Sequence, residues 1–353
     1  MCLKKLLCLG GLAAAIGVLI YWNDAVVLER AEARMNTWMT LSVEAPRETA
    51  NRALDGSFAL LRKLNDGLSR YVETSDISRL NASAGAAPVK VAPETWELLQ
   101  SALILSEATE GYFDPTVGPL TDLWRILAKE GSSGFPVLAE NAVAAARELV
   151  DYRSLSLISP DLAFLRSRGT ALDLGAIAKG YAADKVADYC KTLGVRSALL
   201  DLGGNILVWG SRKKPWRLGV RHPLKGRDSI ACVLEFSFAS NEVMSVVTSG
   251  SYERFREIDG KRLSHVFDPH TGFPIETSLL SVSVIDPRSA KADALATAFL
   301  VMGEEKARGI LRRFQGTEAI FIYQDGDKLA INVTIGLEKS LKSSETEAAI
   351  NIF

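Results

Sequence analysis

The chain has 353 residues, of which 48% are hydrophobic and 24% charged, and its formal net charge at pH 7 is −1. These values are typical of a globular protein, and the length allows one large domain or two medium ones. A nearly neutral chain lacks the global basic field that attracts nucleic acid, so no nucleic-acid partner is expected. There is no heptad run, long low-complexity tract or repeat of fixed period.

The N-terminus has the pattern of a membrane segment. Lys4 and Lys5 precede an apolar run without charges over residues 6–22. At about 1.5 Å per residue, such a run can just cross a thin bilayer core. We predict a signal anchor over residues 1–24, with a cleaved signal peptide as the alternative. The lysines would stay in the cytoplasm, which places the body on the periplasmic side of the inner membrane.

The rest of the chain alternates helical and strand-like patterns without regular βαβ units. Helices are predicted at 48–69, 93–109, 140–149, 176–193 and 290–302. Strands are predicted at 39–43, within 155–172, at 197–208 around a Gly-Gly turn, and at 216–220, 230–238, 243–247, 281–285, 319–323 and 329–333. This mixture predicts an α+β or mixed α/β body with two lobes and a flexible joint near 131–134.

Four cysteines are too few and too scattered for a thiolate metal site, since no C-x-x-C occurs. Cys190 and Cys232 lie in the body and are expected to be buried and unpaired, with a disulfide between them as the alternative. The residues from Glu338 onward are polar and are expected to form a loose tail.

Two stretches are suited to phosphate. At 173–180 a strand ends at Asp173, a glycine turn follows, and a helix begins near Lys179. Helix N-termini offer free N–H groups and a positive dipole end, although an ordinary strand–helix junction reads the same way. The run Thr248-Ser249-Gly250 combines two hydroxyls with a permissive glycine, a combination that also occurs in common turns.

A histidine-containing turn lies at 265–272. A histidine near neutral pKa is the usual proton acceptor for a hydroxyl nucleophile, which makes His265 a candidate base. A metal pair with His270 and a purely structural turn are the alternatives, because Pro269 and Gly272 do not fix ligand directions as a helix does.

Asp293 and Thr297 are spaced i and i+4 on a predicted helix that is otherwise rich in alanine, so they share one face. A carboxylate, a hydroxyl and nearby backbone carbonyls form a hard oxygen site of the kind that suits Mg²⁺ on a pyrophosphate. A buried polar pair that caps a loop is the alternative. Farther upstream, Tyr112, Phe113 and Asp114 could hold a planar ring or fill a core under a turn.

Together these stretches resemble the FAD:protein FMN transferase family, the ApbE-like flavin transferases. The matching pieces are 75–81, 111–120, 173–184, 201–205, 248–250, 265–274 and 292–297, and the resemblance covers about 35–314. It implies a two-lobed, T-fold-like transferase domain over residues 33–337, with a flavin site between the lobes, followed by the polar tail 338–353.

The resemblance also implies an activity. A Mg²⁺-dependent enzyme of this family splits FAD, attaches FMN through a phosphoester to a threonine of a target protein, and releases AMP. The expected acceptor is a membrane redox subunit on the same side as the enzyme. The alternatives are a Mg²⁺-dependent FAD pyrophosphatase that yields FMN and AMP, and a non-catalytic, exported flavin-binding module.

The resemblance assigns roles to individual residues. It implies Asp293 and Thr297, with the backbone carbonyl of Ala176, as ligands of Mg²⁺, and Asp293 and His265 as catalytic residues. The residues that it implies for the FAD site are Met35, Tyr71, Tyr112, Phe113, Asp114, Asp173, Lys179, Thr248, Ser249, Gly250 and Phe267. The sequence departs from the family pattern at Asn36, Tyr112 and Ala296, where a glycine, an alanine and a second acid are common.

Overall fold

The computed structural model describes residues 25–35, 37–127, 138–158, 161–226, 229–239, 242–251, 255–258, 261–264, 266–326, 328–343 and 348–353. Three predictions fall outside these ranges: the anchor at 1–24, the joint at 131–134 and the base His265. Within the described ranges, no helix combines the length and the apolar character that a membrane crossing requires.

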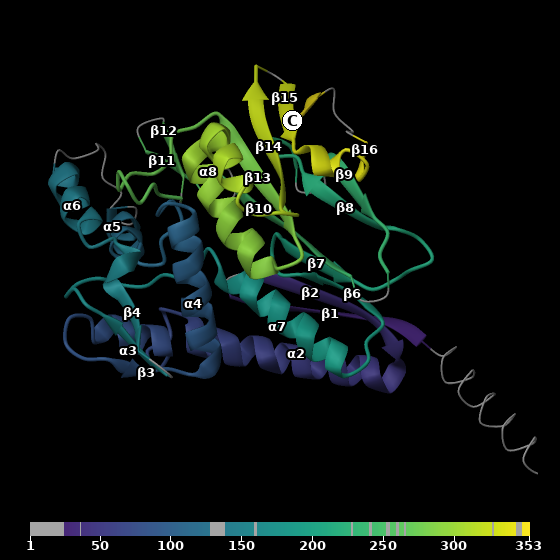
Figure 1. Cartoon of the computed structure of the whole chain (residues 1–353), viewed down its shortest axis with the longest axis horizontal. Coiled ribbons are helices and arrows are strands. Elements are labelled where there is room, and N and C mark those ends of the chain that lie inside the picture. The colour runs from purple at the N-terminus through teal and green to yellow at the C-terminus, as the bar shows by residue number, and fades with distance from the viewer. Residues whose placement is uncertain are drawn as a thin grey trace, which may run out of the picture.

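A nine-stranded sheet forms the centre of the molecule (Figure 1). In spatial order its strands are β1 (Ala25–Arg34), β2 (Thr37–Pro46), β6 (Ser197–Asp201), β7 (Asn205–Trp209), β10 (Val243–Gly250), β13 (Leu279–Asp286), β14 (Glu318–Asp325), β15 (Lys328–Val333) and β17 (Ala349–Ile352). Neighbouring strands are antiparallel except β15 and β17. Alternation of side chains along these strands gives the sheet two apolar faces.

The helices cover one face of the sheet. They are α2 (Arg47–Leu68), α7 (Ala178–Thr192) and α8 (Ser289–Leu311), with α4 (Pro93–Ala108) beside them (Figure 1). Val247 of β10 and Phe321 of β14 point into the core beneath the helices. Their neighbours Val246 and Ile320 point to the opposite face, which is covered by the small sheet of β8 (Trp216–Arg221), β9 (Ile230–Phe236) and β16 (Leu341–Ser343).

A second group of elements lies at one end of the large sheet (Figure 1). It contains α3 (Asp76–Ala82), α5 (Gly118–Leu127), α6 (Leu138–Arg147) and the small sheet of β3 (Val89–Lys90), β5 (Leu162–Leu165) and β4 (Leu155–Ile158). The hairpin of β11 (Phe255–Ile258) and β12 (Lys261–Ser264) and two short 3₁₀ turns, Tyr152–Ser154 and Ile335–Leu337, complete the described elements. Leu98 of α4, Leu165 of β5 and Leu295 of α8 share one core, so this group and the helical layer have a continuous apolar interior.

Most of the predicted helices and strands are confirmed to within a few residues, and so are the two buried, unpaired cysteines. The elements β1, α3 and α5 were not predicted. β1 is an edge strand whose charged and apolar residues are only partly buried, so its pattern is weak. The helix predicted over 290–302 ends at Gly303, whose φ of 76° and ψ of 165° are not helical, and a second helical segment follows across this kink within α8.

The C-terminal residues differ from the expected loose tail. β17 pairs in parallel with β15, and the N–H of Phe353 donates to the carbonyl of Val333. The Arg308 guanidinium lies 3.5 Å from the centre of the Phe353 ring. Polar composition predicted a free segment, but backbone pairing with an open sheet edge does not depend on side-chain polarity.

Candidate functional site

The N-termini of α7 and α8 meet backbone to backbone. A β-carbon placed on Gly180, in the first turn of α7, would lie 2.2 Å from the carbonyl oxygen of Ser289, the first residue of α8. Only glycine permits so close an approach. The contact therefore explains the glycine that follows Lys179, which the sequence alone did not.

Asp293 lies at this junction and is only 2% exposed. Its Oδ2 atom accepts a hydrogen bond of 2.9 Å from the N–H of Gly180, and its Oδ1 atom is 3.5 Å from Nζ of Lys179. Gly180 is the third residue of α7, so its N–H is one of those at the start of a helix that have no partner within the helix. Asp293 supplies the missing acceptor, and the Ala176 carbonyl lies just before the helix begins.

Strand β10 contributes hydroxyl groups to the same place. The hydroxyls of Ser249 on β10 and Thr297 on α8 are hydrogen-bonded at 3.1 Å. The neighbouring Thr248 hydroxyl is bonded to that of Ser283 on β13 at 2.7 Å. Gly250 is the last residue of β10 and is buried. Lys179 thus contacts Asp293 and Ser249 contacts Thr297, and the two pairs are joined because Asp293 and Thr297 lie one turn apart on α8.

The donor set at this junction fits a hard divalent cation. A carboxylate, a hydroxyl and a backbone carbonyl are oxygen ligands of the kind that Mg²⁺ takes, with waters or phosphate oxygens completing the shell. Within the described parts of the chain, no group of three or more His, Cys, Asp or Glu side chains has the geometry of a metal site. A cation at the junction would therefore depend on Asp293 as its carboxylate, together with Thr297 and Ala176.

Asp173 belongs to a second, adjoining cluster. Its Oδ1 atom accepts from the N–H of Gly175 at 2.9 Å, and its Oδ2 atom is 3.2 Å from Nη1 of Arg70. Arg70 also bonds the carboxylate of Asp122 at 2.5 Å and has a side chain only 8% exposed. Sequence reasoning missed Arg70, because no local pattern distinguishes it and its partners lie about 50 and 100 residues away.

Tyr71 is in contrast exposed, with 65% of its surface accessible. The guanidinium groups of Arg70 and Arg125 each lie 5.7 Å from the centre of its ring. Partial burial of the hydroxyl and the nearby charge of Asp173 raise the pKa of Tyr71. An accessible ring flanked by cations is suited to stacking on an electron-poor planar group or to binding near phosphate.

Asp114 and Phe113 occupy structural positions. Oδ1 of Asp114 accepts from the N–H and the hydroxyl of Thr116 at 2.7 and 2.6 Å, and Oδ2 accepts from the N–H of Tyr152 at 2.8 Å. Burial raises the pKa of the Asp114 carboxyl, although these hydrogen bonds lower it. Phe113 is 3% exposed and belongs to the main core. Phe113 therefore lies in the core, as the core alternative for this stretch proposed, whereas Asp114 bonds Thr116 and Tyr152 and also borders a pocket.

Tyr112 is placed differently from its neighbours. Its ring centre is 4.3 Å from that of His270, and its hydroxyl accepts a hydrogen bond from Nζ of Lys306 on α8. Phe267 lies near the same turn and stacks on Trp124 at 6.1 Å. Met35, in the β1–β2 turn, has a positive φ of 45° and packs partly against the main core.

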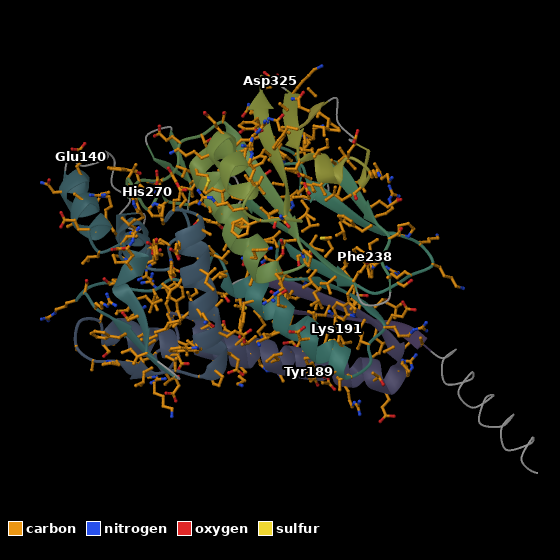
Figure 2. The ribbon with its side chains drawn as sticks, in the orientation of Figure 1. Glu140, Tyr189, Lys191, Phe238, His270 and Asp325 are labelled. Carbon is orange, nitrogen blue, oxygen red and sulfur yellow. The ribbon has the colours of Figure 1, made fainter. Side chains whose placement is uncertain are left out.

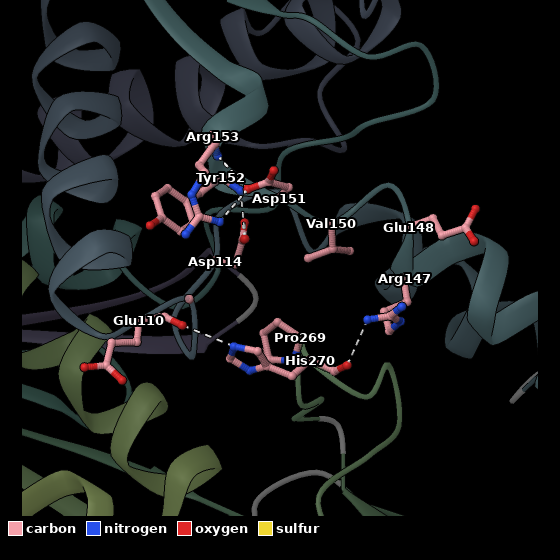
Figure 3. A pocket seen from close by; sticks show the side chains of 11 residues that line it. Glu110, Asp114, Arg147, Glu148, Val150, Asp151, Tyr152, Arg153, Pro269 and His270 are labelled. Atoms are coloured by element: carbon pink, nitrogen blue, oxygen red, sulfur yellow. Dashed lines mark hydrogen bonds and ion pairs between the residues drawn. The ribbon is translucent and has the colours of Figure 1, made fainter.

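A pocket of about 480 Å³ lies beside the turn that carries His270 (Figure 3). Its wall includes Asp114, and Nε2 of His270 is 3.1 Å from the carbonyl oxygen of Glu110 across it. A second pocket, of about 740 Å³, is lined by Lys191 and Phe238, which lie well away from His270 (Figure 2). Neither pocket is lined by Asp293 or Thr297. The candidate site therefore lies at the α7–α8 junction, where the contacts of these two residues are found.

Comparison with known proteins agrees with this architecture. The model of the ApbE family matches residues 35–321. This chain belongs to the ApbE family.

Individual members of the ApbE family are similar over most of their length. A FAD:protein FMN transferase of Treponema pallidum (strain Nichols) is 39% identical over 314 residues, which cover 84% of each chain. The flavinyl transferase ApbE of Pseudomonas stutzeri, in its apo form, superposes with a TM-score of 0.75 at 29% identity, covering 90% of this chain and 97% of that one. The flavin transferase ApbE of Vibrio cholerae superposes with a TM-score of 0.76 at 27% identity, covering 90% and 99%.

Proposed function

We propose that this chain splits FAD in a Mg²⁺-dependent reaction and transfers FMN to a threonine hydroxyl of a target protein, with release of AMP. Membership of the ApbE family identifies the chain as a flavin transferase, an enzyme of the FAD:protein FMN transferase class. The observation that carries the finer proposal is the oxygen-donor set of Asp293, Thr297 and the Ala176 carbonyl at the α7–α8 junction.

Asp293, Thr297 and the Ala176 carbonyl would hold Mg²⁺. When bound, Mg²⁺ would neutralise the negative charge of the pyrophosphate, which is a large electrostatic contribution to phosphoryl-type transfer. The ammonium of Lys179 lies beside Asp293 and can approach the same phosphate oxygens. The positive dipole end of α7 and the hydroxyls of Thr248 and Ser249 add further favourable interactions with phosphate.

The chemical step is an in-line displacement. The oxygen of the acceptor threonine forms a bond to the phosphorus on the FMN side, and the bond between that phosphorus and the bridging oxygen breaks. AMP leaves with the bonding electron pair, and the threonine proton passes to a base. We assign that role to His265, which should contribute about 10²- to 10⁴-fold to the rate.

We also propose that the enzyme is anchored in the inner membrane with its body on the periplasmic side. The apolar run at 6–22 and the two preceding lysines support this location. An anchored transferase would meet membrane redox subunits exposed on the same side, and we propose such a subunit as the acceptor.

One experiment separates the three activities considered. The body of the protein is incubated with FAD, MgCl₂ and the soluble domain of a candidate acceptor, and the mass of the acceptor is then measured. Transfer adds one FMN phosphoester to the acceptor and releases one AMP. Free FMN and AMP with no change in the acceptor, across a panel of acceptors, would identify a pyrophosphatase. FAD that stays intact with and without metal would identify a binding module.

A further inference from the structure

Helices α7 and α8 both begin without a cap of their own. The residues at their N-cap positions are Ile177 and Arg288, and neither side chain makes a capping hydrogen bond. The first N–H groups of a helix lack partners within the helix, and leaving them buried and unpaired is costly. At α7 the Leu174 carbonyl accepts from the N–H groups of Ile177 and Ala178, and at both helices further N–H groups are bonded by side chains of the other helix.

Asp184 of α7 caps the N-terminus of α8. Its Oδ1 atom accepts from the N–H of Ser289 at 2.8 Å, and its Oδ2 atom accepts from the N–H of Ala290 at 3.0 Å. In the opposite direction, Asp293 of α8 accepts from the N–H of Gly180 on α7. Each helix thus caps the other through one aspartate, and the two capping sites enclose the close contact at Gly180.

This reciprocal arrangement bears directly on the candidate metal site. The Ala176 carbonyl precedes α7, whereas Asp293 and Thr297 lie on α8, so the donors meet only when the two helices keep one register. Asp293 cannot enforce that register alone, because a bound cation would draw on the same carboxylate. Asp184 is four residues from Gly180 and eight from Ala176 along the chain, and its two oxygens bond the N–H groups of Ser289 and Ala290. It is not one of the proposed ligands, so it can hold the register while Asp293 binds the cation.

We infer that Asp184 is a positioning residue that fixes α8 against α7 and thereby sets the affinity of the junction for a divalent cation. This inference rests on the proposed function, since it takes Asp293, Thr297 and Ala176 as the ligands. Partners outside the ligand shell commonly change metal affinity by about 10- to 100-fold when they are removed. Asp184 would act on the metal through the helix that carries Asp293 and Thr297.

The test measures metal binding directly. Mn²⁺ is titrated into the protein, and free Mn²⁺ is counted by electron paramagnetic resonance well below the unfolding temperature. For Asp184→Ala we expect the Kd for Mn²⁺ to rise about 10- to 100-fold. Asp184→Asn keeps one acceptor oxygen, so its Kd should rise less than that of Asp184→Ala. The matched control is Asp188→Ala, an exposed aspartate one turn farther along α7, which should bind Mn²⁺ like the wild type.

The possible outcomes separate the inference from the proposed function. Circular dichroism first confirms that each variant is folded, and Asp184→Asn decides the question if Asp184→Ala does not fold. A folded Asp184 variant with a lower melting temperature but a wild-type Kd would overturn the inference and leave Asp184 with a purely structural role. A wild-type protein that binds no Mn²⁺ would overturn the metal assignment in the proposed function, and the inference with it.

Discussion

Two buried aspartates, Asp293 and Asp114, show how the same residue type has two different roles in this chain. Both match motifs of the ApbE family, and both are nearly inaccessible, at 2% and 5% exposure. Asp114 receives two hydrogen bonds from Thr116 in its own loop and one from the N–H of Tyr152 in a separate 3₁₀ turn. Asp293 receives one backbone N–H from another helix and lies near a lysine.

The difference shows why burial alone does not identify a reactive carboxylate. The oxygens of Asp114 are occupied by fixed neighbours, so this side chain stabilises the loop. The contact recorded for Oδ1 of Asp293 is the ammonium of Lys179 at 3.5 Å, which a metal ion can replace. We therefore place the chemistry at the α7–α8 junction and expect Asp114 to act mainly on stability. The family resemblance implied Asp293 as a metal ligand and catalytic residue and Asp114 as part of the FAD site, and the latter stays a prediction.

The largest expected effect comes from Asp293→Ala. Removing the carboxylate removes the charged metal ligand, so transfer should fall about 10⁴-fold, to the detection limit. The measurement is the rate of AMP release with Mg²⁺ as the added metal. Asp293→Asn keeps an acceptor for the Gly180 N–H and should be almost as inactive, whereas His265→Ala should retain more activity. Wild-type flavinylation by Asp293→Ala would contradict the metal assignment.

Asp114→Ala should damage stability instead of chemistry. It leaves the buried N–H groups of Thr116 and Tyr152 unpaired, which should lower the free energy of unfolding by about 2–3 kcal/mol. Urea denaturation measures this change, and the KM for FAD of the folded variant should stay near the wild-type value. The control is Asp151→Ala, an exposed aspartate in the same region, with an expected loss below about 1 kcal/mol. Unchanged stability combined with weaker FAD binding would instead place Asp114 in the flavin site.

The pH dependence of stability tests the junction from another direction. Withdrawal from water raises the pKa of Asp184 to about 6, although the N–H groups of Ala290 and Ser289 and the charge of Arg288 lower it, and Asp188 raises it further. Because the folded protein holds this proton more tightly than the unfolded chain does, the contribution is favourable at low pH and is lost as the pH rises through about 6.

Between pH 4.5 and pH 7, the wild type should therefore lose about 1–2 kcal/mol of unfolding free energy through Asp184, after allowance for partial screening of this half-buried group. Asp184→Asn should not show this loss. The measurement is the difference in unfolding free energy between wild type and variant at the two pH values, so that other titrating groups cancel. A difference that stays constant with pH would show that Asp184 does not titrate in this range.

The smallest effect is expected for Lys179→Met. Its ammonium lies 3.5 Å from Oδ1 of Asp293, so its removal should favour a cation there and lower the Kd for Mn²⁺ about 3- to 10-fold. FAD binding should weaken in the same variant, because a phosphate-binding charge is lost. Lys185→Met is the matched control on α7, where the lysine is paired with Glu97 at 2.6 Å. Weaker Mn²⁺ binding by Lys179→Met would indicate that Lys179 supports the metal site instead of competing with it.

The sequence by itself determined the helices and strands with strong periodicity, the buried state of Cys190 and Cys232, and the pairing of Asp293 with Thr297. These features are local, since they depend on residues within one or two turns of each other. Family motifs also imply Lys179 in the FAD site and Ser249 beside its phosphates, and both assignments stay predictions. Elements with weak amphipathic patterns, such as β1 and α5, escaped the same reasoning.

Only the tertiary structure decided which of these residues act together. The contact between Ser249 and Thr297, the reciprocal caps of Asp184 and Asp293, and the ion pair of Arg70 with Asp173 all join residues that lie far apart in the chain. Such contacts arise when separate elements pack around one core, and no periodic pattern encodes them. For the same reason, only packing could show that Asp114 bonds Thr116 and Tyr152 through its two oxygens, whereas Asp293 bonds the N–H of Gly180 and pairs with Lys179.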